Sequence, residues 1–200
     1  ALICTKVGGR NSPISGPKRI RDSAENSLKR LRRDAIDVYL LHVPSPDQVL
    51  DGELHRELEK LKQEGKIRSF GVSIQHAGEV EQAKNVLNYP GFSAIQLSLN
   101  LLQRENELVL PVLGDRGLGV IARVPLASGL LTGKYDSNSI FPDDDGRGGW
   151  AVSSDKVNQQ LSLLPAVQTL AMEEGLTLIQ ASLAWVLSHG AVSTAIPGAK

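Results

Sequence analysis

A lysine and a histidine each stand at the end of an apolar segment of the sequence. Lys6 closes the run of residues 1–5, and His42 closes the run of residues 36–41. A strand that becomes polar only at its last residue carries that side chain to one edge of a sheet, where α/β folds perform chemistry. An ammonium and an imidazole at one edge of a sheet are candidate catalytic groups. Taken singly, each residue is more often structural, as a surface ion pair or a histidine satisfied by backbone groups.

Segments with strand character follow one another along the chain, most of them separated by a helical pattern. They end near residues Thr5, His42, Ser73, Ser98, Val124 and Pro197. Because the apolar runs are nearly continuous, this alternation predicts a parallel sheet covered by helices. Within the second segment, period-two alternation places Val38, Leu40 and His42 on one face and turns Tyr39 towards the helices, where it is a poor proton donor.

Several helices carry clear sequence signals. Helical spacing relates a stripe of leucines and predicts one amphipathic helix: Leu50, Leu54, Leu58 and Leu61. We expect Gly65 to end this helix. Asp22 with Glu25 in the first helix, and Thr177 with Gln180 in the last, are spaced like capping boxes.

Two architectures compete for this α/β pattern. An open doubly wound sheet usually carries a G-x-G-x-x-G turn after an early strand, and this sequence contains none. We therefore predict a (β/α)8 TIM barrel with about six of its eight βα units in this chain. Residues 1–200 are expected to form a single, partial domain. The periodicity fails over residues 131–157, which predicts a lid or binding loop.

Composition excludes several classes of protein. Lysine plus arginine equals aspartate plus glutamate at 22 each, which argues against binding to nucleic acid or to a membrane surface. Cys4 is the only cysteine, so we expect a reducing, cytoplasmic location without disulfides. Three adjacent acids, residues 143–145, cannot all face one ion, and no metal site is expected.

Read together, the motifs strongly resemble the aldo-keto reductase superfamily along essentially the whole chain. The segments that carry the resemblance are 5–8, 36–44, 65–73, 96–100, 125–135 and 196–199. Their order and spacing are most similar to the bacterial-type branch, which also includes the potassium-channel β subunits.

The resemblance implies a chemistry as well as a fold. Family members bind NAD(P)H across the carboxyl ends of the barrel strands and transfer hydride from nicotinamide C4 to the carbonyl carbon of an aldehyde or ketone. A tyrosine protonates the oxygen, a lysine lowers the pKa of that tyrosine, an aspartate pairs with the lysine, and a histidine orients the carbonyl. The expected cofactor is therefore NADP(H), with NAD(H) as the alternative, and the expected partner is a small carbonyl substrate.

The resemblance assigns roles by position. Lys6 matches the family lysine and His42 the family histidine. Ser73 and Gln96 match positions that hydrogen-bond the nicotinamide carboxamide, although Gln96 could simply bridge strands. Arg123 matches a position where an aromatic side chain often stacks on the nicotinamide. The turn that lines the pyrophosphate is matched by Val124, Pro125, Leu126, Ala127 and Ser128. Lys134 and Arg147 match basic positions of the loop that closes over the cofactor, and Gly198 and Lys200 lie where the adenosine-phosphate segment begins. Lys134 and Arg147 have solvated loop charges as their structural alternative.

The sequence also departs from the family pattern. The asparagine or arginine that follows the serine is Ile74 here, so one carboxamide contact depends on Gln75 or His76. The family's aspartate and tyrosine belong to two βα units that would precede residue 1, and its adenine-gripping residues would follow Lys200. We therefore expect a fragment of a longer reductase with negligible turnover alone, or a chain whose sheet is closed by a partner or in an oligomer. The alternative is a non-catalytic nucleotide-binding or interaction module, as the channel β subunits suggest.

Overall fold

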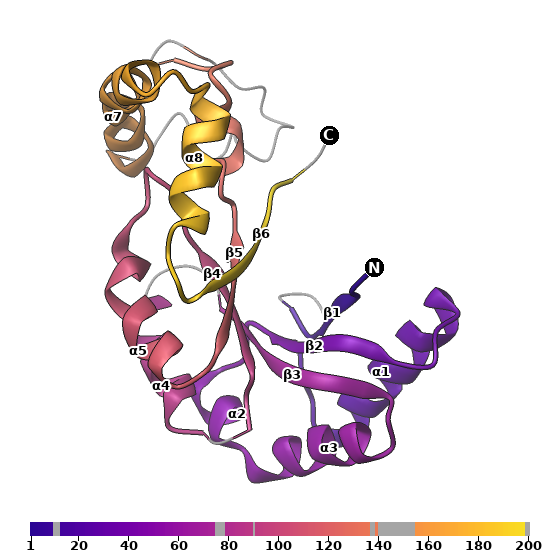
Figure 1. The fold of residues 1–200 in the computed structure, drawn as a ribbon. Coiled ribbons are helices and arrows are strands. Elements are labelled where there is room, and N and C mark those ends of the chain that lie inside the picture. Colours follow the sequence, from indigo (N-terminus) through magenta and orange to yellow (C-terminus); the bar gives the residue numbers. More distant parts are fainter. Residues whose placement is uncertain (10–12, 75–78, 90, 137–138, 140–154, 199–200) are drawn as a thin grey trace. The chain divides into compact units, whose positions relative to one another are not determined.

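The computed structural model describes residues 1–9, 13–74, 79–89, 91–136, 139 and 155–198 (Figure 1). In chain order, the first half contains β1 (Cys4–Val7), α1 (Pro17–Leu31), β2 (Ile36–His42), α2 (Pro46–Leu50), α3 (Gly52–Gln63), β3 (Ile67–Ser73), α4 (Glu79–Leu87) and β4 (Ala94–Ser98). The second half contains η1 (Glu105–Val109), α5 (Leu110–Asp115), β5 (Gly119–Arg123), η2 (Ala127–Thr132), α7 (Asp155–Glu173), α8 (Leu178–Leu187) and β6 (Val192–Ile196). The predicted strand ends agree with these bounds to within two residues.

The described strands follow one another in the sheet in sequence order, from β1 to β6. β1 pairs with β2, β2 with β3, and β3 with β4, all in parallel. Each crossover from β1 to β4 passes through at least one helix, as the parallel arrangement requires. The prediction of a parallel sheet covered by helices is therefore confirmed.

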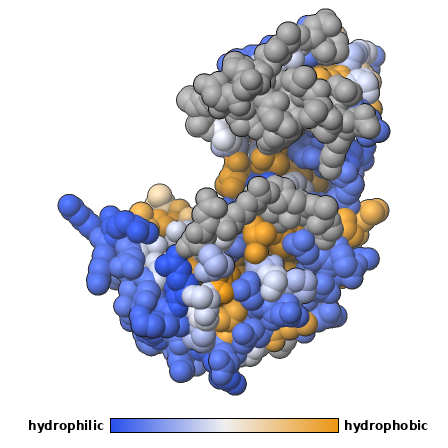
Figure 2. Space-filling view, turned by 180° about the vertical axis from the view of Figure 1, so that it is seen from behind, coloured by the Kyte–Doolittle hydropathy of each residue, from blue (hydrophilic) through white to orange (hydrophobic). Residues whose placement is uncertain are grey.

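The chain divides into two compact units. Unit 1 contains residues 1–97 and 108–121, and unit 2 contains residues 98–107 and 122–200. In unit 1 the buried side chains Leu40, Ala94 and Ile121 form a core cluster with Val38 packed against it. Charged and polar side chains dominate the face of this unit that is visible in the lower part of Figure 2. The single-domain organisation expected from the sequence stays a prediction.

Two features of the helices differ from the expectation. The capping box predicted at Asp22 and Glu25 is wrong, because both residues lie inside α1, where Asp22 pairs with Lys18 one turn earlier. α1 begins at Pro17, whose preset φ and missing N–H suit a first helical turn, and its N-cap Gly16 makes no side-chain bond.

The leucine stripe does not belong to one helix. α2 ends at Leu50, which is 53% exposed, and α3 begins at Gly52. The backbone is extended at Asp51, and the Asp51 carboxylate accepts hydrogen bonds from the N–H groups of Glu53 and Leu54. A strong N-cap therefore restarts the helix. The remaining leucines of the stripe are buried, as predicted, and Gly65 follows the end of α3 with a φ of 74°.

Unit 2 has its own apolar core. It is built from residues of η2, α7 and α8 and the segment before η1: Leu102, Ala127, Leu130, Leu131, Leu161, Leu164 and Leu178. α8 begins with the predicted capping box, in which Thr177 and Gln180 bond each other's backbone N–H. Among the described helices, none alone has the length and apolar composition of a membrane span. Only α7 and α8 taken together reach that length and composition, and the two helices are bent by 88° relative to each other.

Candidate active site

The strand register of unit 1 builds two rows of side chains on one face of the sheet. Lys6 pairs with Leu40, which pairs with Gly71. One step nearer the carboxyl ends, His42 pairs with Ser73, which pairs with Gln96. Because residues in register on neighbouring strands point to the same face, the candidate side chains of four strands share one face and one end of the sheet.

Tyr39 lies on the opposite face, as predicted from the alternation. It is fully buried, and its hydroxyl donates a hydrogen bond to the Ile20 carbonyl oxygen of α1 at 3.0 Å. Burial raises the pKa of Tyr39 to about 12. The phenol of Tyr39 is therefore a structural link between β2 and α1, on the side of the sheet away from the candidate site.

Lys6 and Gln96 are in direct contact. The Lys6 Nζ atom donates a hydrogen bond to the Gln96 Oε1 atom at 2.5 Å. The Ser73 hydroxyl donates to the same oxygen at 3.1 Å. Both Ser73 and Gln96 are buried, whereas Lys6 is partly exposed. In the row that starts at Lys6, Leu40 is followed by Gly71 and Ala94. Gly71 has no side chain and Ala94 a short one, so the part of this face over β3 and β4 stays open to the lysine.

The backbone after β1 closes over His42. The His42 Nδ1 atom lies 3.4 Å from the Gly8 carbonyl oxygen. Gly8 and Gly9 have φ values of 97° and 133°, and a Cβ atom at Gly9 would lie 3.2 Å from His42 Nδ1. Only glycine combines this conformation with such a close approach. The two glycines thus position the imidazole, a role that sequence reasoning missed.

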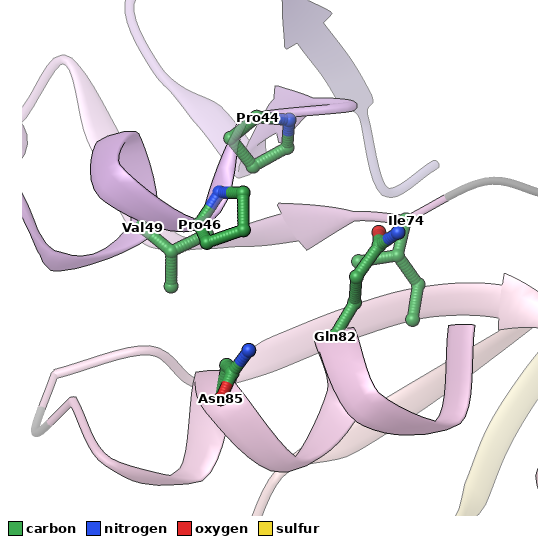
Figure 3. A pocket seen from close by; sticks show the side chains of 6 residues that line it. All are labelled: Pro44, Pro46, Val49, Ile74, Gln82 and Asn85. Carbon is green, nitrogen blue, oxygen red and sulfur yellow. The ribbon is translucent and has the colours of Figure 1, made fainter. Parts of the chain in front are cut away.

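Ile74 follows Ser73 directly and is 1% exposed. It lines a small pocket between α2 and α4, together with Pro44, Pro46, Val49, Gln82 and Asn85 (Figure 3). The isoleucine is therefore held by apolar packing and offers no polar group at this position. Gln75 and His76, the predicted substitutes, lie outside the described residues.

A turn with unusual backbone geometry follows β5 in unit 2. Val124, Ala127 and Ser128 have φ values of 46°, 47° and 54°, the left-handed region that side chains disfavour. Turns of this type gather backbone N–H groups into concave sites that suit anions. The strain coincides with the predicted pyrophosphate segment, of which Pro125 and Ala127 are buried and Leu126 packs against the core of unit 2.

Asn100 holds this turn from the neighbouring strand end. Its side-chain amide donates to the Val124 carbonyl oxygen at 3.1 Å, and its side-chain oxygen accepts from the Leu102 N–H at 3.0 Å. Asn100 is fully buried. Sequence reasoning noticed Asn100 only as part of a motif, and its position two residues after a buried strand was the one available signal.

The other candidates of unit 2 are spread along the chain. Arg123 is the last residue of β5 and is partly buried. Lys134 and Gly198 are exposed, and Lys134 shows its backbone N–H bonded to the Thr132 hydroxyl. Arg147 and Lys200 lie outside the described residues, as does most of the predicted lid loop. Within the residues that the structure describes, no cluster of three or more histidine, cysteine, aspartate or glutamate side chains could hold a metal ion.

The profile described as the Aldo/keto reductase family matches residues 1–200. The chain belongs to the aldo/keto reductase family. Two similar proteins are the Schizosaccharomyces pombe aldo-keto reductase yakc (NADP(+)), 30% identical over 100% of this chain and 61% of its own length, and the Bacillus subtilis aldo-keto reductase YhdN, 32% identical over 91% and 55%.

Solved structures of aldo-keto reductases resemble the chain over its whole length. The glycerol dehydrogenase AKR11B4 from Gluconobacter oxydans superposes with a TM-score of 0.82 at 33% identity, over 99% of this chain and 63% of that protein. The apo form of the aldo-keto reductase AKR11C1 from Bacillus halodurans gives 0.74 at 26% identity, over 100% and 61%. These neighbours and the strand order confirm the (β/α)8 class. The chain thus spans 55% to 63% of the lengths of these relatives.

Proposed function

We propose that this aldo/keto reductase chain is part of an NAD(P)H-dependent oxidoreductase that reduces a small aldehyde or ketone. The observation that carries the proposal is the convergence of the Lys6 ammonium and the Ser73 hydroxyl on the amide oxygen of Gln96, in the register row that also contains His42. An ammonium and an imidazole at the carboxyl edge of a parallel sheet provide the groups that stabilise and orient a carbonyl oxygen.

Each unit, taken by itself, has residues that fit one part of a nicotinamide dinucleotide. Ser73 and Gln96 offer buried hydrogen-bonding groups for the carboxamide of the nicotinamide ring. The left-handed turn at residues 124–128 suits a pyrophosphate, and Lys134 supplies a positive charge nearby in the sequence. When bound, the dinucleotide supplies the hydride. The yakc relative is named for NADP(+), which favours NADP(H) over NAD(H) for this chain.

The proposed proton donor is a phenol, and each tyrosine of this chain has a structural contact of its own. Tyr39 bonds α1 on the opposite face, and Tyr89 stacks on His55 with ring centroids 3.2 Å apart. Tyr135 packs against the core of unit 2. We therefore propose that the donor tyrosine and its aspartate lie outside residues 1–200, in the part of the relatives' length that this chain does not span. In this proposal Lys6 lowers the pKa of that tyrosine, and His42 orients the carbonyl group of the substrate.

The test follows oxidation of NADPH and of NADH by a generic aldehyde, using the protein expressed from its complete reading frame. We expect turnover with that protein, a loss of about 100-fold or more in kcat for Lys6→Met, and no change for the surface control Lys84→Met. Residues 1–200 alone should show negligible turnover. Turnover of the segment equal to that of the full protein contradicts the assignment of the donor. Dinucleotide binding without any turnover contradicts catalysis and supports a non-catalytic module.

A further inference from the structure

The Gln96 amide is placed between two hydrogen-bond donors. We infer that the charge of Lys6 sets the orientation of the Gln96 amide and thereby the donor or acceptor character that the site presents to a ligand. This inference rests on the proposed function, because the ligand is a nicotinamide dinucleotide. It makes Lys6 a positioning residue for binding, in addition to its proposed role towards the donor phenol.

The orientation of the amide follows from chemistry. A lysine ammonium has three donors and no acceptor, so the Gln96 atom that faces it at 2.5 Å is the oxygen. A flipped amide would place its NH2 group against the ammonium, donor against donor, in a side chain that is 2% exposed. Water cannot relieve such a mismatch in a buried group, and an unpaired buried donor is costly. The Ser73 hydroxyl, which donates to the same oxygen at 3.1 Å, supports the same orientation.

The fixed orientation has a consequence for ligands. With Oε1 turned to Lys6 and Ser73, the two N–H groups of Gln96 point the other way. They suit an acceptor, and the carboxamide oxygen of a nicotinamide ring is one. With a neutral, apolar side chain at position 6, only Ser73 would remain, and its hydroxyl accepts as readily as it donates. Both amide orientations would then have similar energies, and the ligand would have to select one of them.

The spacing of the strands makes this coupling specific to Lys6. Lys6 and Gln96 lie on β1 and β4, ninety positions apart in sequence. The rows between them contain Leu40, Gly71 and Ala94. Because Gly71 has no side chain, a long flexible side chain from β1 can cross the face and reach the amide.

The affinity test uses calorimetry with the full protein and two probes, NADP+ and 2′,5′-ADP, which lacks the nicotinamide. We expect Lys6→Met to weaken NADP+ binding by about tenfold, which corresponds to about one hydrogen bond, and to leave 2′,5′-ADP binding unchanged. Lys6→Arg, which keeps the cation, and Lys84→Met on α4 should bind both probes as the wild type does.

In the double variant Lys6→Met/Gln96→Leu, the affinity for NADP+ should equal that of Gln96→Leu alone, because the two residues act through one contact. Additive losses, or unchanged NADP+ affinity in Lys6→Met, overturn the inference.

A second measurement needs no ligand and separates this inference from the proposed function. The side-chain amide signals of Gln96 in a 1H–15N spectrum are assigned by their disappearance in Gln96→Glu. We expect them to shift in Lys6→Met and to stay in place in Lys84→Met. Unshifted signals overturn the inference even where NADP+ binds. If the signals shift but the wild type binds neither NADP+ nor NAD+, the amide orientation stands and the proposed cofactor is wrong.

Discussion

His42 shows how a single side chain of the site depends on its backbone surroundings. Its imidazole lies beneath the Gly8–Gly9 segment, with Nδ1 facing the Gly8 carbonyl oxygen. A carbonyl only accepts, so this contact favours the tautomer with hydrogen on Nδ1. The orientation of the ring therefore depends on two residues that carry no side chain.

The substitution Gly9→Ala tests this dependence. The new Cβ atom would lie 3.2 Å from His42 Nδ1, and the φ of 133° would be strained. Gly16→Ala is a matched control, since Gly16 has a φ of 136° but nothing within 4 Å of the added Cβ. We expect both variants to lose about 1–3 kcal/mol of stability from backbone strain. Only Gly9→Ala should lower kcat with the aldehyde, by about tenfold, with NADP+ affinity unchanged. An equal effect of both variants on kcat contradicts the role of Gly9.

At the scale of elements, the pairing of β3 and β4 depends on one glycine. A Cβ atom at Gly71 would lie 1.8 Å from the Ala94 carbonyl oxygen. The neighbouring backbone cannot move away without breaking the ladder that holds Ser73 beside Gln96. We predict that Gly71→Ala prevents folding or lowers stability by at least about 3 kcal/mol, measured by soluble yield and chemical denaturation. Gly52→Ala, at the start of α3 with open space around it, serves as the control. A soluble Gly71→Ala protein with unchanged stability contradicts the prediction.

The turn after β5 depends on a hydrogen bond from another element. Asn100 bonds Val124, and Asn106 similarly donates to the Ser98 carbonyl oxygen at 2.8 Å. Because both asparagines are buried and both bond a backbone carbonyl, we expect Asn100→Ala and Asn106→Ala each to lose about 1–3 kcal/mol of stability. Only Asn100→Ala should also weaken NADP+ binding, by about tenfold, since it releases the strained turn. Calorimetry on both variants checks this, and equal affinities of the two contradict it.

At the scale of the whole molecule, the stability of the fold in acid depends on titratable groups that are not part of the candidate site. His55 is buried against Tyr89, Phe70 and Phe92, with Nε2 at 2.9 Å from the Val49 carbonyl oxygen. Burial lowers the pKa of His55 below its ordinary value of 6.5. Hydrogen bonds from Arg21 and Lys66 lower the pKa of Glu64 from 4.5 to about 2.

The pKa values of His55 and Glu64 are both lowered in the folded state, so both groups reduce the stability of the fold as the pH falls. A histidine with a lowered pKa resists protonation in the folded state, so stability falls as the pH drops below about 6.5. A carboxylate with a lowered pKa stabilises the fold above about 4.5, and this stability is lost as the pH falls towards 2. We therefore predict an unfolding midpoint that decreases in two stages on acidification. In His55→Gln, whose amide still donates to Val49 but does not titrate, the first decrease should shrink. Midpoints measured between pH 8 and pH 3 check this, and an unchanged first stage in His55→Gln contradicts the assignment.

Features that depend on a few neighbouring residues could be predicted from the sequence, but not all helix boundaries could. The strand ends, the opposite faces of His42 and Tyr39, and the cap of α8 follow from alternation and spacing over a few residues, and the structure agrees with them. The helix break at Asp51 and the start of α1 at Pro17 were missed. In both places a local N-terminal signal overrides a longer periodic pattern, because a cap or a proline decides where backbone N–H groups find partners.

The sequence by itself determined the alternation of strands and helices, and with it the (β/α)8 class and the edge where Lys6 and His42 lie. Only the tertiary structure decided that Lys6 reaches Gln96, that Gly9 closes over His42 and that Asn100 holds the turn at Val124. The physical reason is that periodicity acts along the chain, whereas hydrogen bonds between distant residues depend on strand register and on the space that neighbours such as Gly71 leave open.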